Sequence, residues 1–265
     1  MKISVMRIIS FLLVFLLFSC KSNNLEENVP KYRSFEYSNT SGVLPYRALL
    51  PENYDASKSY PLVLILHGAG ERGNDNIAQL THGSSLFLKK EVREKFPAIV
   101  VFPQCPEDSY WSNVEKKRDP KSFTFTFSPD GEPTQAMQTL QGLIPDLRNK
   151  YKIDQNRMYV GGLSMGGMGT LELVRRNPNM FAAAFSICGG AHPETAPQLT
   201  NTKWWFFHGD ADVVVDYQYS VNMVNALKAE NVNPKFTTYE GVNHNSWENA
   251  FAEPELLPWL FTNSK

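Results

Sequence analysis

One serine of the chain lies in a pattern that exposes a hydroxyl group for attack on a carbonyl carbon. Residues Gly162–Gly166 read Gly-Leu-Ser-Met-Gly, between an apolar segment and a helical one. In this pattern a sharp strand-to-helix turn raises the serine, and the glycines let neighbouring backbones pass close by. We therefore predict that Ser164 is a nucleophile. The alternative is a glycine-rich packing turn in which the serine has no chemical role.

A nucleophilic serine needs a histidine as general base, and the histidine needs a carboxylate that orients it. Where the serine stands on such a turn, the acid and then the histidine follow it along the chain. His192 and His208 come too early for this order, whereas His244 lies in a short loop before the last predicted helix. His244 is therefore the predicted base, against the alternative of a surface loop histidine.

Three aspartates follow the strand predicted at residues 204–207, and each is a candidate for the acid. Asp216 is also well placed to cap the next helix, and Asp210 could be limited to shaping the turn. Asp212 comes later in the loop than Asp210 and has room to reach the histidine. We favour Asp212 and keep Asp210 as the alternative.

Acyl transfer also needs backbone N–H groups that stabilise the oxyanion of the tetrahedral intermediate. One should come from Met165, the residue after the nucleophile, and the other from the loop after the third strand. That loop reads His-Gly-Ala-Gly from His67, so Ala69 or Gly70 is the expected donor. The His67 side chain is then expected to hold the loop.

Four motifs can be compared with known families. They are HGAGERGN at 67–74, GLSMG at 162–166, HGDAD at 208–212, and His244 followed by Ser246 and Trp247. Together they resemble carbohydrate esterase family 1, which includes feruloyl esterases, acetylxylan esterases and polyhydroxybutyrate depolymerase-like enzymes. They are also similar to secreted phospholipase/carboxylesterase-type proteins of the same superfamily, and the match spans about residues 45–250. The resemblance implies a triad of Ser164, Asp212 and His244, and it favours Asp212 over Asp210.

The elements that must position these residues alternate between strands and helices. Extended segments at residues 32–37 and 46–50 indicate an antiparallel hairpin. Apolar runs predict further strands at 61–66, 98–102, 158–160, 181–187 and 203–207. Runs that are apolar on both faces indicate a parallel sheet covered by helices on each side. The predicted class is α/β, an α/β-hydrolase fold with a mostly parallel sheet, an N-terminal antiparallel hairpin and helices on both faces.

Prolines mark the predicted helices. The helices are expected at residues 134–151, 165–176, 216–230 and 246–261. Pro145 should kink the first of them, and Pro178 should end the second. Pro254 and Pro258 should interrupt the last.

The N-terminus has the organisation of a bacterial lipoprotein signal. Lys2 and Arg7 form a short positive region before an apolar run at residues 8–18. This run is too short to span a bilayer comfortably. The run ends in Leu-Phe-Ser-Cys and resembles a lipobox. Cys20 is therefore expected to be the lipidated first residue of an exported protein, against the alternative of a plain signal peptide.

A lipid anchor divides the chain into a signal at residues 1–20, a tether and a domain. Residues 21–30 are polar and end in proline, which suits a tether. Residues 31–265 then form one catalytic domain. The expected location is a bacterial membrane, with the domain in the periplasm or at the cell surface.

Two further cysteines, Cys105 and Cys188, would meet an oxidising compartment, which favours disulfide formation. Both follow predicted strands that lie about three spacings of roughly 4.8 Å apart in the usual strand order. A bridge needs Cα atoms within about 7 Å. We therefore predict two free, partly buried thiols, and a bridge is the alternative if the loops that follow the strands converge.

The composition of the chain limits the classes of partner that we expect. The 265 residues are 42% hydrophobic and 20% charged, with a net charge of −1 and no long run of one sign. Nucleic acid is not an expected partner, because its recognition needs clustered basic residues. The five histidines lack metal-ligand spacing, and the predicted chemistry needs no metal or other cofactor. The oligomeric state is left open.

Aromatic residues after the strand at 98–102 are candidates for substrate contact, since loops at this end of a sheet bind ligands. Trp111 and the phenylalanines of residues 123–127 could line an acyl or sugar pocket. For residues 123–127, a half-buried strand covering the core is the equal alternative.

Three residues near the predicted site have two interpretations each. Glu71 and Arg72 follow the oxyanion loop and could contact substrate or form an internal ion pair. Trp247 could wall the pocket or pack under the His244 loop.

These features predict a serine carboxylic ester hydrolase that removes feruloyl or acetyl groups from plant polysaccharide. A general short-chain carboxylesterase or phospholipase-like esterase is the main alternative. A prolyl-oligopeptidase-like peptidase is less favoured, because the usual propeller domain does not fit in 265 residues. A silent glycan-binding module is disfavoured because all three triad positions are filled.

Overall fold

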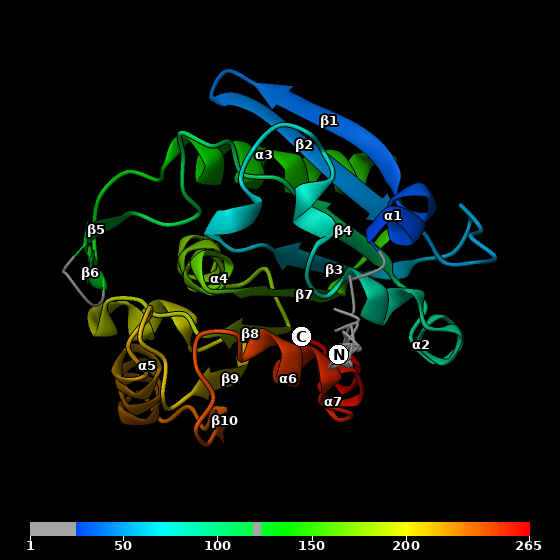
Figure 1. The fold of residues 1–265 in the computed structure, drawn as a ribbon. Helices are drawn as coiled ribbons and strands as arrows, with labels where there is room; N and C mark the ends of the chain where they lie inside the picture. The colour runs from blue at the N-terminus through cyan, green and yellow to red at the C-terminus, as the bar shows by residue number, and fades with distance from the viewer. Residues whose placement is uncertain (1–24, 119–122) are drawn as a thin grey trace, which may run out of the picture.

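A computed structural model describes residues 25–118 and 123–265 of the chain (Figure 1). Within them, eight strands form one sheet in the order β1-β2-β4-β3-β7-β8-β9-β10, and β5 pairs with β6 in a separate hairpin. The strands are β1 Arg33–Asn39, β2 Gly42–Leu49, β3 Tyr60–Leu66, β4 Ile99–Pro103, β5 Val114–Arg118, β6 Phe123–Phe127, β7 Ile153–Leu163, β8 Ala183–Ile187, β9 Lys203–Gly209 and β10 Lys235–Tyr239. In this sheet, the neighbours along β4-β3-β7-β8-β9-β10 pair in parallel. The pairs β1–β2 and β2–β4 are antiparallel. The predicted α/β-hydrolase fold is thereby confirmed.

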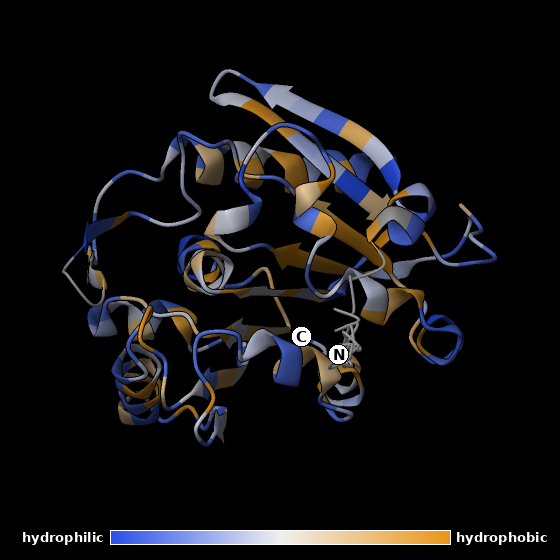
Figure 2. Ribbon diagram, in the orientation of Figure 1, coloured by the Kyte–Doolittle hydropathy of each residue, from blue (hydrophilic) through white to orange (hydrophobic). Residues whose placement is uncertain are grey.

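Helices cover both faces of the sheet (Figure 1). One core contains residues of α3 (Gln135–Lys150), α4 (Met165–Arg176) and α5 (Gln218–Ala229), and the other contains residues of α2 (Lys90–Lys95), α6 (Trp247–Ala252) and α7 (Leu256–Thr262). Successive residues of a strand point to opposite faces, so Leu64 lies in the first core and Val63 and Ile65 lie in the second. Figure 2 shows the hydrophobic residues gathered on the central strands β3 and β4.

Pro145 lies inside α3, which continues through it as one helix. One proline acts differently from the prediction. The last predicted helix divides at Pro254 into α6 and α7, as expected, but Pro258 lies inside α7. It is the third residue of that helix, where a missing N–H removes no intrahelical hydrogen bond.

Residues before the predicted start of the domain also contact its core. Residues 25–31 form α1 (Leu25–Asn28) and a 3₁₀ turn (Val29–Lys31), and both Leu25 and Val29 pack against the second core. The first part of the predicted tether lies outside the described residues, as do the signal and Cys20. In the part of the chain that the structure describes, no helix is both long and apolar enough to cross a bilayer.

The carboxyl ends of the parallel strands meet at one edge of the sheet, where ligand sites of such folds lie. β3 ends before His67, β7 before Ser164 and β8 before Cys188. β9 leads into the loop that carries Asp212, and β10 into the loop that carries His244. Five segments that are distant in sequence therefore converge on one site.

Both cysteines of the described residues are free and buried, as predicted. β4, which precedes Cys105, lies three places from β8, which precedes Cys188, in the order β4-β3-β7-β8. The sheet itself keeps the two thiols apart.

Candidate active site

Ser164 occupies a strained turn between β7 and α4. Its backbone has φ 52° and ψ −116°, values that side chains other than glycine rarely adopt. Its N–H donates to the Ile187 carbonyl over 2.8 Å, which fixes the turn to β8. A Cβ atom on Gly166 would collide with the backbone carbonyl of Leu66, so this position of the pattern requires glycine. The turn holds the Ser164 side chain partly exposed above a buried backbone.

The structure brings Ser164, His244 and Asp212 into one hydrogen-bonded chain. The Ser164 hydroxyl lies 3.0 Å from His244 Nε2, and His244 Nδ1 lies 2.7 Å from Asp212 Oδ2. Nδ1–H donates to the carboxylate, which leaves Nε2 free to accept the serine proton. This arrangement can activate a serine hydroxyl for nucleophilic attack.

Asp212 is a buried carboxylate with a dense set of donors. Its side chain is fully buried, and Oδ1 accepts the backbone N–H groups of Val214 and Val215 over 2.8 and 2.9 Å. Burial opposes ionisation, but hydrogen bonds from His208 and His244 outweigh it and hold the pKa of Asp212 well below its usual range. The carboxylate is therefore ionised at neutral pH.

The two alternative aspartates have other roles. Asp210 is exposed and accepts the Gly241 N–H over 2.7 Å, which ties the loops after β9 and β10 together. Asp216 accepts the N–H of Gln218, the first residue of α5, over 2.8 Å. The geometry therefore favours Asp212 over Asp210 as the partner of His244.

Three backbone N–H groups near Ser164 have no protein acceptor among the described residues, namely those of Met165, Ala69 and Gly70. Met165 begins α4, and Ala69 begins the 3₁₀ turn Ala69–Glu71 after β3. These are the groups predicted to stabilise an oxyanion. The Gly68 N–H is not available for this role, because it donates to the Glu71 carboxylate.

His67 holds the oxyanion loop from beneath, as predicted. Its Nδ1–H donates to the Gly68 carbonyl over 2.6 Å, and its Nε2 accepts the Cys105 N–H over 2.9 Å. Burial lowers the pKa of His67 to about 4, so the ring is neutral at physiological pH. Both ring nitrogens have partners, and neither is free for catalysis.

Glu71 and Arg72 fix the surrounding loops. Arg72 donates to the Ala69 carbonyl over 3.0 Å and to the Glu107 carbonyl over 2.8 Å. Glu71 Oε1 lies 3.6 Å from His82 Nε2, a contact that is an ion pair only when the histidine is protonated, and burial lowers the pKa of His82. Burial raises the pKa of Glu71. Both side chains contact the surrounding loops, as the internal alternative to a substrate contact allowed.

The two tryptophans have opposite placements. Trp111 is fully buried, and its Cβ packs where Gly169 of α4 leaves room, so the prediction that it lines a pocket is wrong. Trp247 is partly exposed, and its ring meets that of His244 at 5.3 Å and that of His82 at 5.1 Å. Trp247 and His82 also line a cavity of about 400 Å³ between α6 and the segment 81–89. Of the two tryptophans predicted to contact substrate, Trp247 is the one that lies beside His244.

The β5–β6 hairpin packs beside α4 and the Asp212 loop. Phe125 is buried against Met168 and Val215, whereas Phe123 and Phe127 are only partly buried. The phenylalanine segment is thus the half-buried strand that sequence allowed as an alternative. Its partner β5 was not predicted, because Val114–Arg118 is mostly charged and exposed.

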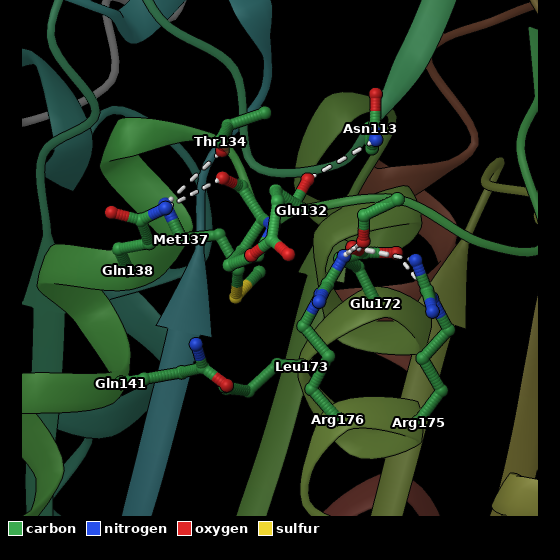
Figure 3. A network of polar contacts seen from close by, with 12 residues as sticks. Asn113, Glu132, Thr134, Met137, Gln138, Gln141, Glu172, Leu173, Arg175 and Arg176 are labelled. Carbon is green, nitrogen blue, oxygen red and sulfur yellow. Dashed lines mark hydrogen bonds and ion pairs between the residues drawn. The ribbon is translucent and has the colours of Figure 1, made fainter.

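A buried charged cluster on α4 anchors the segment that follows this hairpin, and Figure 3 shows its three side chains, Glu172, Arg175 and Arg176. Arg175 and Arg176 both donate to the Glu172 carboxylate, over 2.6 Å from each Nε. Arg175 also donates to the Pro129 carbonyl and Arg176 to the Gly131 carbonyl, over 3.2 and 2.7 Å. The cluster was missed in the sequence, although acid and base at spacings of three and four on a helix indicate such pairs.

One group of metal-binding residue types coincides with the triad. Among the described residues, ligand atoms of Cys188, Asp212 and His244 lie within 4.8 Å of one another. His244 and Asp212 already bind each other through the atoms that would face an ion. The arrangement of these three side chains therefore fits the hydrogen bonds from Ser164 to Asp212 better than it fits a bound metal ion.

Known proteins resemble the chain over most of its length. Residues 53–254 match the family model for phospholipase/carboxylesterase. Acyl-protein thioesterase 1 of Candida albicans is 25% identical over 223 residues, which cover 77% of this chain and 92% of that protein. A probable feruloyl esterase C of Aspergillus oryzae is 24% identical over 188 residues, which cover 70% of this chain and 61% of that protein.

A solved thermostable esterase has the same fold. It is 30% identical with a TM-score of 0.80, and the superposition covers 90% of this chain and 64% of that one. The chain thus spans nearly all of the thioesterase but less than two thirds of the feruloyl esterase and of the thermostable esterase.

Proposed function

We propose a function for this chain from the premise that it belongs to the phospholipase/carboxylesterase family and is a serine esterase of the α/β-hydrolase type. Ser164 is the nucleophile, His244 the general base and Asp212 the residue that orients it. The observation that carries this assignment is the hydrogen-bonded chain from the Ser164 hydroxyl through both nitrogens of His244 to the Asp212 carboxylate.

The reaction follows from this chain. His244 Nε2 takes the hydroxyl proton as Ser164 Oγ bonds to the ester carbonyl carbon, and the N–H groups of Met165 and of Ala69 or Gly70 stabilise the oxyanion. His244 then returns the proton to the alcohol oxygen as the ester C–O bond breaks, which leaves an acyl-serine. A water molecule, deprotonated by His244, hydrolyses this intermediate by the same steps.

The proposed substrates are feruloyl or acetyl esters of plant polysaccharide. The likeness to a probable feruloyl esterase supports this class. Partly exposed apolar side chains near the triad, Trp247 on α6 and Val214 in the acid loop, could pack against an aromatic or small acyl group.

A general carboxylesterase or phospholipase-like esterase is the second candidate. The family match and the coverage of nearly the whole acyl-protein thioesterase favour it. Both candidates use the same triad and differ only in the acyl and alcohol groups accepted.

A panel of esters tests these proposals. Methyl ferulate, p-nitrophenyl acetate and acetylated xylan are given to the purified domain, with Ser164→Ala as the control. Hydrolysis of ferulate or acetylated xylan that the variant loses supports the polysaccharide proposal. Activity on simple short-chain esters with none on the other two would instead indicate a general carboxylesterase. Strong cleavage of a peptide substrate would indicate a peptidase.

We also propose that Cys20 carries a lipid that anchors the exported protein to the bacterial membrane. The basic and apolar organisation of the N-terminus and its Leu-Phe-Ser-Cys ending support this. Mass spectrometry of the membrane fraction tests it. An unmodified Cys20, or cleavage at another position, would contradict the proposal.

A further inference from the structure

Asp212 has a second histidine neighbour besides His244. His208, near the end of β9, is fully buried, and its Nε2 lies 3.1 Å from Asp212 Oδ2, the oxygen that His244 also contacts. Its Nδ1 lies 2.7 Å from the hydroxyl of Ser220 on α5. Both ring nitrogens are therefore engaged, and their partners determine where the ring protons lie.

Nε2 of His208 must carry a proton, because both of its partners only accept. One is the ionised Asp212 carboxylate, and the other is the Val215 carbonyl oxygen at 3.0 Å. Neither group can donate a hydrogen bond. Nε2–H is therefore shared between them.

Nδ1 of His208 carries a proton as well, because the Ser220 hydroxyl donates elsewhere. Ser220 Oγ lies 3.0 Å from the Gly189 carbonyl, which is buried and has no other donor among the described residues. If Ser220 donated to Nδ1 instead, this carbonyl would lose its hydrogen bond, at a cost of about 1–3 kcal/mol. When Nδ1–H donates to Ser220 and Ser220 donates to the Gly189 carbonyl, each of these three groups has a hydrogen-bond partner.

The charge of Asp212 supports the same assignment. A buried carboxylate needs a compensating positive charge. Among the described residues, His208 and His244 are its only ion-pair partners. His244 must be neutral to act as a base, so His208 is the group that can hold the charge.

We propose that His208 is a buried imidazolium that positions Asp212 and limits the negative charge that Asp212 presents to His244. The charge state follows from the hydrogen bonds alone, whereas its effect on the rate rests on the proposed function. His208 does not touch the reacting atoms and is a positioning residue.

Other groups that face His208 are few. The Tyr217 ring packs against it at 5.6 Å and 80°, from the segment before α5. Cys188, after β8, lies near Asp212, and burial raises the pKa of its thiol so that it stays neutral. Asp212 is therefore the charged group that the imidazolium meets directly.

Nitrogen NMR of ¹⁵N-histidine-labelled full-length protein tests the charge without using activity. We expect both ring nitrogens of His208 to resonate as protonated nitrogens at about pH 7. Loss of these signals in His208→Gln assigns them. A single unprotonated nitrogen at that pH in the wild-type protein would overturn the proposal, even if esterase activity is present.

The pH profile of ester hydrolysis tests the effect on His244. Without the positive charge, Asp212 stabilises protonated His244 more strongly, so a higher pH is needed to free the base. In His208→Gln, the acid limb of kcat/KM should move upward by on the order of one pH unit, whereas His192→Gln, at a partly exposed histidine whose Nδ1 accepts the Glu194 N–H, should leave it in place.

Ser220→Ala provides a second variant for the same profile. It removes the acceptor of Nδ1–H but keeps the ring, and should shift the limb in the same direction by a smaller amount. A limb that stays in place in both folded variants would contradict the proposal, because a merely structural histidine would lower the rate without moving the profile. Complete absence of ester hydrolysis in the wild-type protein would instead refute the proposed function and leave the NMR result to decide the charge.

Discussion

Asp212 accepts four hydrogen bonds from described residues, from the backbone of Val214 and Val215 and from His208 and His244. These bonds orient both oxygens, so the carboxylate has little freedom to rotate away from His244. They also keep it ionised in a buried position. The orientation of the His244 ring therefore depends on groups that do not contact the substrate.

Asp212→Asn should reduce kcat by about 10³–10⁴, because an amide N–H₂ can face His244 Nδ1 and favour the wrong tautomer. Asp210→Asn is the matched control, since its Oδ1 can still accept the Gly241 N–H. Steady-state rates on p-nitrophenyl acetate provide the comparison. Similar losses in the two variants would show that the acid has been misassigned.

Sequence predicted the residues whose role depends on a local motif and missed those whose role depends on packing. Ser164 and His244 stand in patterns that dictate their neighbours along the chain. Trp111 was placed wrongly, because its burial depends on the space left by Gly169, far away in sequence. The contacts of His208 likewise depend on α5, which packs against its strand only in the folded chain.

At the scale of elements, the glycines around Ser164 allow α4 to approach β3. A Cβ on Gly166 would meet the backbone of Leu66, which cannot rotate away as a side chain could. Gly166→Ala should therefore destabilise the fold by about 1–3 kcal/mol or more. Urea unfolding measures this, with Gly70→Ala as the control because a Cβ there meets nothing within 4 Å. Equal stabilities would show that the close approach is not limiting.

The cluster around Glu172 ties the segment after β6 to the helix that follows the nucleophile. The Glu172 side chain is 7% exposed, and Arg175 and Arg176 are 11% and 14% exposed, so water screens these pairs poorly. Glu172→Gln leaves two guanidinium groups without a counter-charge and should lower the free energy of unfolding by about 3 kcal/mol.

Urea unfolding, together with hydrogen exchange of the amides in the segment after β6, checks this prediction. The control is Glu94→Gln, because Glu94 is 58% exposed in its pair with Lys90 and should contribute less than about 1 kcal/mol. If both variants unfold at the same urea concentration, or if the segment after β6 exchanges at the wild-type rate in Glu172→Gln, the anchoring role is wrong.

The central strands were readable from sequence because burial on both faces makes them apolar throughout. The hairpin strand β5 was not, because Val114–Arg118 has no apolar alternation and becomes a strand only through pairing with β6. The short 3₁₀ turns at Ala78–Leu80 and Ser84–Leu88 were not predicted either, because they too depend on tertiary contacts rather than on a local sequence pattern.

At the scale of the whole molecule, a buried neutral histidine couples stability to pH. The pKa of His67 falls from 6.5 to about 4 on folding because of burial. The stabilisation is therefore fully present above about pH 6.5 and is lost as pH falls toward about 4, where the unfolded chain binds a proton that the folded chain excludes.

Between about pH 7 and pH 4.5 this group should lower the free energy of unfolding by about 2–3 kcal/mol. Urea unfolding at the two pH values measures the change. His67→Gln, which cannot titrate, should show a smaller decrease, whereas His192→Gln should follow the wild type. An unchanged decrease in the His67 variant would assign the effect to other groups.

The sheet order explains why one site forms from five separated segments, since parallel strands deliver their carboxyl ends to a common edge. The account depends above all on Ser164 being the activated nucleophile at that edge. Labelling with a fluorophosphonate, followed by mass spectrometry of the peptides, tests this most directly. We predict one adduct, on Ser164, that is absent from folded Ser164→Ala. An adduct on another serine, or no adduct on the folded wild-type protein, would contradict the account.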